Sequence, residues 1–114
     1  MPAPAERVSA DRRLILTETA TPAGTRVVLF EDTWRQHILR AHGELQPYLQ
    51  DILDTVASPH HRENDPWPGR ERFFKQHVGP SVWLMVVVSS ETIPVRIVTA
   101  LGYQHGRSPK GWTP

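Results

Sequence analysis

Three short runs of β-forming residues, separated by turn residues, constrain the fold more than any other feature of this sequence. The runs are 70–78, 82–90 and 95–103, and the middle one is apolar at almost every position. A strand that is buried on both faces is apolar throughout, whereas a strand with one solvated face alternates. The links at 79–81 and 91–94 are short enough for antiparallel hairpins. The sequence therefore predicts an antiparallel meander over 70–103, with 82–90 as its middle strand.

Two further strands and an amphipathic helix are predicted ahead of this meander. The stretches 12–19 and 25–31 are rich in apolar and β-branched residues, and the loop ATPAG between them contains turn-forming proline and glycine. The next stretch is WRQHILRAHGEL (34–45), where apolar residues recur with helical spacing. These residues are Trp34, Ile38, Ala41 and Leu45. Gly43 is the predicted terminator of this helix.

A second helix follows and completes the predicted architecture. Pro47 suits its first turn, and the helix is expected to end before Ser58-Pro59. The apolar stripe between these points consists of Leu49, Ile52, Leu53 and Val56. Residues 60–69, HHRENDPWPG, are expected to form a polar loop or a short edge strand. The predicted fold class is α+β, with two helices packed on an antiparallel sheet and extra strands at the N-terminus.

Length and composition bound the domain organisation. A chain of 114 residues suits one domain with one core. We expect a disordered segment over 1–10, a single domain over 11–106 and a tail over 107–114. The absence of cysteine excludes disulfides, thiolate metal sites and a cysteine nucleophile. No apolar run could span a bilayer or serve as a secretion signal, so a cytoplasmic location without a membrane partner is expected.

Positive net charge is concentrated in the second half of the chain, where residues 58–114 contain seven basic and four acidic residues, although the net charge of the whole chain is only +1. Seven of the 13 lysines and arginines follow residue 57, namely Arg62, Arg70, Arg72, Lys75, Arg96, Arg107 and Lys110. This asymmetry permits a partner that carries phosphate groups. A solvated basic face explains it equally well.

The predicted helix 34–45 carries two histidines beside its apolar stripe. On a helical wheel His37 and His42 lie about 140° apart, on opposite shoulders of the stripe. They therefore cannot bind one metal ion from the same face. Each lies at the edge of the core, where an imidazole can be half buried and hydrogen-bonded. A packing role and a functional role both fit this position.

The sequence gives little support for a metal site, a serine nucleophile or a nucleotide-binding motif. His60 and His61 are neighbours in a predicted loop, but adjacent residues seldom point at one ion, and no carboxylate lies at a familiar ligand spacing. No serine lies on a recognisable nucleophile elbow, and the chain has no P-loop and no GxGxxG motif. The sequence predicts neither a metal site nor a cofactor.

A metal-free set of polar residues remains as the candidate site. Basic residues crowd the strand predicted over 70–78, and alternation places Thr99 on the same face as Ile97 and Leu101. If this face meets the helices, Thr99 comes near the two helix histidines. Imidazole, guanidinium and hydroxyl groups can cleave RNA without a metal. One group takes the proton of the 2′-OH, another protonates the leaving 5′-oxygen, and cations stabilise the phosphorane. Each residue taken alone fits a structural role as well.

Several short motifs resemble those of the phage-associated barnase–EndoU–colicin–RelE-like nucleases, which share the BECR fold. The motifs are WRQHILRAHGEL, ILDTVASP, WLMVVVSS and RIVTALGY, and the resemblance covers about residues 31 to 103. Gly43 stands where proline is usual in the family, which affects the helix end but leaves His42 in place. The resemblance implies helices followed by a four-stranded antiparallel sheet.

The activity implied by this resemblance is metal-independent endoribonuclease cleavage that leaves a 2′,3′-cyclic phosphate, as in a toxin-like or phage-derived enzyme. The implied catalytic residues are His42, His37, Arg72 and Thr99, and the implied substrate-binding residues are Arg70, Lys75 and Tyr103. We favour His42 as the general acid or base, with His37 as its partner or as a structural hydrogen-bonding group. RNA is the expected partner, and a cognate antitoxin or immunity protein is a further candidate.

A catalytically inactive module of the same fold, which binds RNA or protein, is the alternative. Trp67 and Trp112 could serve as its anchors, whereas Trp83 is expected in the core. The discriminating feature is a cleft in which His42 and Thr99 converge with one of the basic residues of the strand 70–78. If these side chains point to different surfaces, the binding module is favoured.

Overall fold

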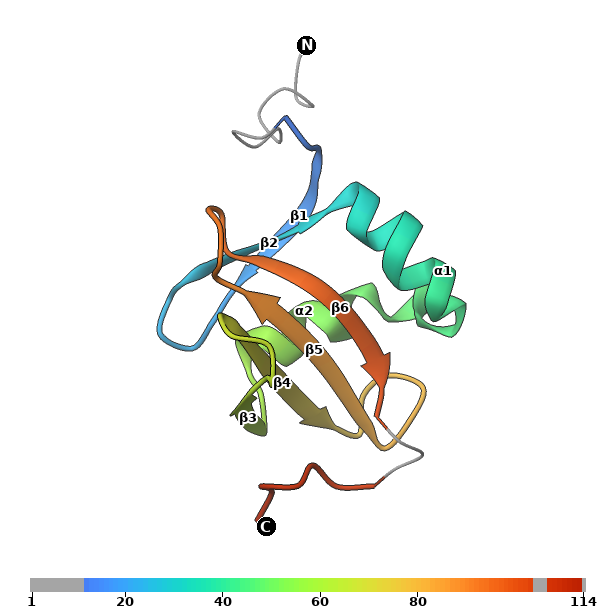
Figure 1. Cartoon of the computed structure of the whole chain (residues 1–114). Coiled ribbons are helices and arrows are strands. Elements are labelled where there is room, and N and C mark those ends of the chain that lie inside the picture. Colours follow the sequence, from blue (N-terminus) through green and yellow to red (C-terminus); the bar gives the residue numbers. More distant parts are fainter. Residues whose placement is uncertain (1–11, 104–106, 114) are drawn as a thin grey trace.

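A computed structural model describes residues 12–103 and 107–113, so the segment 1–10, which was predicted to be disordered, lies outside the described residues. The strands are β1 (Ile15–Ala20), β2 (Arg26–Phe30), β3 (His61–Asn64), β4 (Arg70–Gln76), β5 (Trp83–Ser89) and β6 (Arg96–Gly102). The helical segments are η2 (Thr33–Ile38), α1 (Leu39–Ala41), η3 (Gly43–Tyr48) and α2 (Leu49–Ala57). The α+β class predicted from the sequence is confirmed (Figure 1).

The strands form one six-stranded sheet in the order β1-β2-β6-β5-β4-β3. The predicted meander is confirmed, because β5 pairs antiparallel with both β4 and β6. The edge strand allowed for residues 60–69 is β3, which pairs antiparallel with β4. The sheet is larger than the four-stranded antiparallel sheet that the family resemblance implied, and it is mixed. The β1–β2 hairpin joins it through a parallel pairing of Val28 with Arg96.

The stretch 34–45 is not one continuous helix, contrary to the prediction. The N–H of Leu39 bonds to the carbonyl oxygen of Trp34, five residues back, so η2 is a π-helix. After the short α1, His42 leaves the helical region (φ −139°, ψ 64°), and Gly43 begins the 3₁₀ segment η3 instead of ending a helix. The predicted apolar stripe is buried except for Ala41. The break at His42 changes the helical phase without exposing Leu45.

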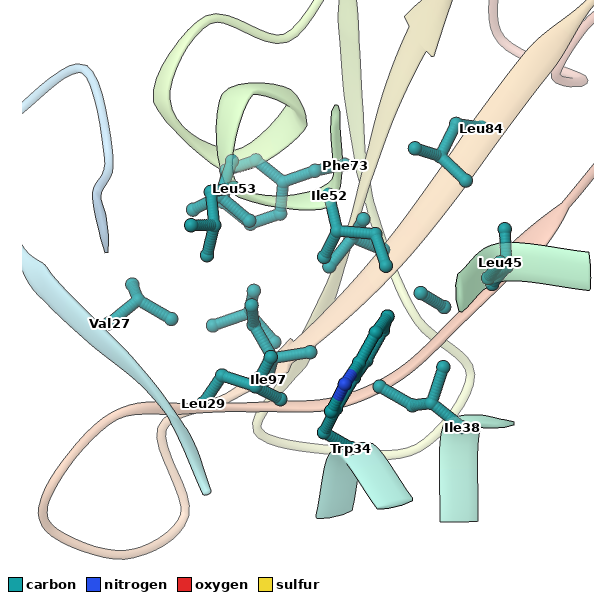
Figure 2. Close-up of a cluster of buried hydrophobic side chains, with 14 residues drawn as sticks. Val27, Leu29, Trp34, Ile38, Leu45, Ile52, Leu53, Phe73, Leu84 and Ile97 are labelled. Carbon is teal, nitrogen blue, oxygen red and sulfur yellow. The ribbon is translucent and has the colours of Figure 1, made fainter. Parts of the chain in front are cut away.

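The helices and the sheet enclose the main core. The stripe of α2 is buried at Ile52, Leu53 and Val56, and α2 contacts β1, β4 and β5. Figure 2 shows Ile52 and Leu53 with Trp34 and Ile38 in a cluster that strands of the sheet complete, and Val56 belongs to the same cluster. The strand residues of the cluster are Val27, Leu29, Phe73, Leu84, Val86, Val88, Ile97 and Ala100. No helix in the described part of the chain is long and apolar enough to cross a membrane.

A second apolar cluster lies on the other face of the sheet, which we call the outer face. Its buried residues are Phe74, Trp83, Met85 and Val87. Trp83 is fully buried, as the sequence predicted. The ring of Trp112, from the expected tail, packs edge-on against Trp83 with the ring centroids 5.1 Å apart. The C-terminal segment therefore covers one end of the outer face instead of only trailing over the surface.

Candidate functional site on the outer face

Arg72 and Thr99 lie in one row across the outer face. Arg72 is paired with Val87 between β4 and β5, and Val87 is paired with Thr99 between β5 and β6. Directly opposite residues in a sheet share a face, with their Cβ atoms about 5 Å apart. The guanidinium-bearing and hydroxyl-bearing residues are therefore about 10 Å apart at their Cβ atoms, on either side of one valine.

A β-bulge in β6 places Thr99 on this face. Val88 pairs with Ile97 and Val87 pairs with Thr99, so β6 has one extra residue, Val98, at this point. Ile97 consequently lies in the main core, whereas Thr99 shares the face of Leu101 and Val87. The expectation that Thr99 lies on the same face as Ile97 is wrong, because simple alternation fails across a bulge. Thr99 faces away from α2 rather than toward it.

Two residues of β3 lie on the outer face and were missed as site residues from the sequence. Glu63 is the cross-strand partner of Arg72, and His61 lies two residues earlier, on the same face. The Nε2 atom of His61 is 3.1 Å from Oε1 of Glu63, and the two side chains are 16% and 28% exposed. The row thus contains a carboxylate, a guanidinium and a hydroxyl. The imidazole of His61 contacts the carboxylate from the neighbouring row, where it also packs against the rings of Phe74 and Trp112. The sequence signal for this pair is that His61 and Glu63 are two residues apart, which places both side chains on one face of a strand.

The adjacent His60 has a structural role instead. Its Nδ1 atom accepts a hydrogen bond from the backbone N–H of Gln76 at 2.8 Å, which ties the start of β3 to the end of β4. Its ring also packs edge-on against Trp83. The two neighbouring histidines therefore have different tasks, and their side chains do not act as a metal-binding pair.

The guanidinium of Arg72 is held in place by Asp65. Its Nε donates to Oδ1 of Asp65 at 2.7 Å, and the Asp65 side chain is 14% exposed. Burial acts to raise the pKa of Asp65, but the N–H of Trp67 and the guanidinium of Arg72 together lower it below its ordinary value. Asp65 therefore carries a negative charge at neutral pH and fixes the orientation of Arg72. Guanidinium has five N–H donors, of which this bond uses one.

Arg70 lies on the same face, one step nearer the end of the sheet. It is paired with Ser89 in the register, and its Nε donates to Oε1 of Glu91 at 3.3 Å. Its guanidinium carbon lies 4.8 Å from the centroid of the Trp67 ring. Arg70 and Arg72 thus form an adjacent cationic pair on one strand.

The helix histidines lie outside this row, on a helical segment whose residues Trp34 and Ile38 pack in the main core. His37 is exposed on η2, which contacts β6, the strand of Thr99 (Figure 1). His42 follows α1, and its Nδ1 atom is 3.7 Å from Oε2 of Glu44. Among the described residues, no hydrogen bond or ion pair joins either histidine to Arg72 or Thr99.

The two remaining predicted residues are occupied elsewhere. Lys75 pairs with Leu84 and so lies on the face of the main core, where its Nζ donates to the carbonyl oxygen of Ser58 at 2.7 Å. Tyr103 packs against Phe74 with the ring centroids 5.1 Å apart. The structure therefore brings Arg70, Arg72 and Thr99 to one face, and it places Lys75 on the other. His42 does not converge with Thr99 and Arg72, so the feature expected of an active nuclease is not met by His42, and a nuclease needs a different proton-transferring group on this face.

No protein-family model, curated protein or solved structure matches the chain. Within residues 12–103 and 107–113, no group of three or more histidine, aspartate and glutamate side chains is arranged to hold a metal ion. The chemistry of the outer face therefore has to be argued from its own residues.

Proposed function

We propose that the protein is a metal-independent endoribonuclease and that the outer face is its active surface. The observation that supports this proposal is the row formed by Glu63, Arg72 and Thr99, with His61 bonded to Glu63. These groups include an imidazole that can act as a general acid or base, a guanidinium that stabilises negative charge and a hydroxyl that donates a hydrogen bond. Cleavage of RNA through attack of its 2′-OH on the adjacent phosphorus requires groups of these three kinds.

The proposed reaction is a transesterification. A base accepts the proton of the 2′-OH, the 2′-oxygen bonds to the adjacent phosphorus, and the bond from phosphorus to the 5′-oxygen breaks. An acid gives the 5′-oxygen a proton, which leaves a 2′,3′-cyclic phosphate and a 5′-OH. Arg72 stabilises the additional charge on the phosphorane oxygens, and the hydroxyl of Thr99 donates to one of them.

The base and the acid stand on opposite sides of the phosphorus in an in-line displacement. His61 and Glu63 are in direct contact, so they act as one proton-transferring unit from the β3 side. The second group comes from the opposite side of the row, where η2 contacts β6. His37 or His42 is proposed for this second role, as the family resemblance implies.

The test is cleavage of a single-stranded RNA by the purified protein in the presence of EDTA, followed by analysis of the fragment ends. Cyclic phosphate or 3′-phosphate ends are expected, and a DNA strand of the same sequence should stay intact because it lacks the 2′-OH. His61→Ala should reduce cleavage by about 10²–10⁴-fold and remove one limb of the pH profile. The matched control is His77→Asn, which removes an exposed histidine from the β4–β5 turn, where asparagine tolerates the positive φ of 65°.

Each outcome of this test has a clear meaning. Cleavage that requires a divalent metal, or that extends to DNA, refutes the proposed chemistry. RNA binding without cleavage favours the inactive binding module of the same fold. If cleavage is unchanged in His61→Ala but lost in His42→Ala, the active surface lies around α1 and η3 instead of on the outer face.

A further inference from the structure

A cavity of about 550 Å³ lies at one end of the sheet, between the β1–β2 turn and the loop that joins β3 to β4. This volume is in the range of pockets that hold small organic ligands. The floor is apolar and belongs to the core face of the sheet, with Phe73, Val88 and Val95. Polar residues of the turn and the loop surround the floor, and they include Thr21, Thr25, Asn64 and Ser90.

A large aromatic side chain forms one wall of this cavity. Trp67 is 56% exposed, whereas tryptophan is highly buried on average. Its indole Nε1 donates to Oε2 of Glu91 at 3.2 Å, and its backbone N–H donates to Oδ2 of Asp65 at 2.8 Å. Arg70 stacks on the ring, while more than half of the side chain stays accessible. The cavity thus presents a fixed aromatic surface to a ligand.

Each charged side chain that lines the cavity has an ion-pair partner of opposite charge. Both oxygens of Glu71 accept hydrogen bonds from Arg62, at 2.6 and 2.9 Å, and the Arg62 guanidinium carbon lies 4.4 Å from the centroid of the Phe73 ring. Asp65 is paired with Arg72 and Arg70 with Glu91. Because these charges are balanced, the cavity suits a neutral ring with its own donors and acceptors better than it suits a phosphate. Carboxylate oxygens retain lone pairs for a further N–H donor.

We propose that this cavity binds one base of the RNA strand, with the base stacked on Trp67 and its polar edge directed toward Glu71 and Asn64. The identity of the ligand as RNA rests on the proposed function. Two residues connect the cavity to the outer face. Arg70 and Asp65 both line the cavity, while Arg70 belongs to the outer face and Asp65 bonds to Arg72 there. A strand that crosses the outer face at Arg72 therefore reaches the cavity around the end of the sheet.

The test measures binding separately from cleavage. The probe is a fluorescent, single-stranded 2′-O-methyl RNA, in which the attacking hydroxyl is blocked, and the readout is fluorescence anisotropy. Stacking of one base on an aromatic ring predicts that Trp67→Ala weakens binding by roughly 5- to 150-fold. Trp67→Phe keeps an aromatic surface and should bind more tightly than Trp67→Ala. Ile93→Ala, which truncates another exposed hydrophobic side chain in the nearby β5–β6 turn, is the matched control and should bind as the wild type does.

A second readout locates the contact. The indole N–H resonance of Trp67, assigned by its loss in Trp67→Phe, should shift when nucleoside monophosphates are added. The proposal is overturned if Trp67→Ala folds and binds the 2′-O-methyl RNA as tightly as the wild type, or if the wild type does not bind it. Binding that depends on Trp67 without any cleavage of natural RNA supports the base-binding cavity and refutes the nuclease. Cleavage of natural RNA together with binding that does not depend on Trp67 supports the nuclease and refutes the base-binding cavity.

Discussion

The glycine that closes the base-binding cavity permits a quantitative test of the local structure. Gly69 has φ +80°, and a Cβ atom added there would lie 2.5 Å from Cγ of Glu91. Gly24 has φ +91° with nothing within 4 Å of such an atom, and Gly43 has neither a positive φ nor a close neighbour. Alanine at these three positions therefore separates backbone strain from a steric conflict.

The expected order of stability follows from these geometries. The left-handed region costs an alanine about 1–2 kcal/mol, so Gly24→Ala should lose about this amount. Gly69→Ala has the same backbone cost, and in addition it must displace the Glu91 side chain that holds Trp67 and Arg70. Its loss should therefore exceed that of Gly24→Ala. Gly43→Ala should be neutral or should stabilise the fold by about 0.4–1 kcal/mol, because alanine lowers the entropy of the unfolded chain.

The assay is urea unfolding at neutral pH, with the free energies of unfolding compared at a common slope. The indole resonance of Trp67 reports the local change and should shift in Gly69→Ala but not in Gly24→Ala. If Gly69→Ala proves no less stable than Gly24→Ala and leaves this resonance unchanged, Glu91 does not hold Trp67 against the loop as described. Trp67 would then not be a fixed wall of the cavity.

Three other predictions concern the core and the ion pairs. Asp65 has a pKa below its ordinary value of 3.8 in the folded state, so its contribution to stability is present above that value and is lost as the pH falls through the folded pKa. Urea midpoints should therefore differ between the wild type and Asp65→Asn at neutral pH and converge in acid; a constant difference would contradict this. Trp34→Ala should cost about 3–5 kcal/mol in urea unfolding, because Trp34 is a buried core aromatic, and a loss below 1 kcal/mol would contradict the packing. Trp112→Ala should increase the quenching of Trp83 fluorescence by a soluble quencher, because Trp83 becomes more accessible. Unchanged quenching would mean that the C-terminal segment does not cover Trp83.

The features predicted correctly from the sequence are those set by local patterns. The meander was predicted because β5 is apolar throughout and the turns on both sides are short. The helix α2 was predicted because its apolar residues recur with helical spacing between a proline and a Ser-Pro pair. These signals depend on residues within a few positions of one another, so no knowledge of the partner elements was needed.

The features that were missed depend on contacts between distant segments. The parallel pairing of β2 with β6 joins residues far apart in the chain, and no local pattern states it. The extra residue Val98 in β6 has no signal in a run of β-branched residues, so the face of Thr99 was assigned wrongly. The π-helix at 33–38 and the break at His42 also interrupt a stripe whose spacing alone suggests one helix.

For the candidate site, residue types were easier to predict than geometry. Arg72 and Thr99, which the family resemblance implies as site residues, do share a face, but they share it because of the bulge and not because of alternation. From the sequence, His61 is weighed only as part of a metal pair with His60, and Glu63 is missed, because HHRENDPWPG fits a polar loop as well as a short edge strand. Treated as an edge strand, the same stretch places the two side chains together on the face of Arg72.

The outer face has an apolar end and a polar row beside it, and the polar row is not needed for packing. At one end, Phe74 and Trp83 are covered by the C-terminal segment and stabilise the fold by burial. In the row beside them, Arg72 forms a half-buried ion pair with Asp65. Such a pair contributes at most about 1 kcal/mol to the free energy of unfolding. Replacing the pair by Arg72→Met and Asp65→Asn together leaves no unpaired charge and keeps an acceptor for the N–H of Trp67. This double variant should be about as stable as the wild type and yet lose the proposed RNA cleavage, because the guanidinium of Arg72 is proposed to stabilise the phosphorane and is not needed for the fold.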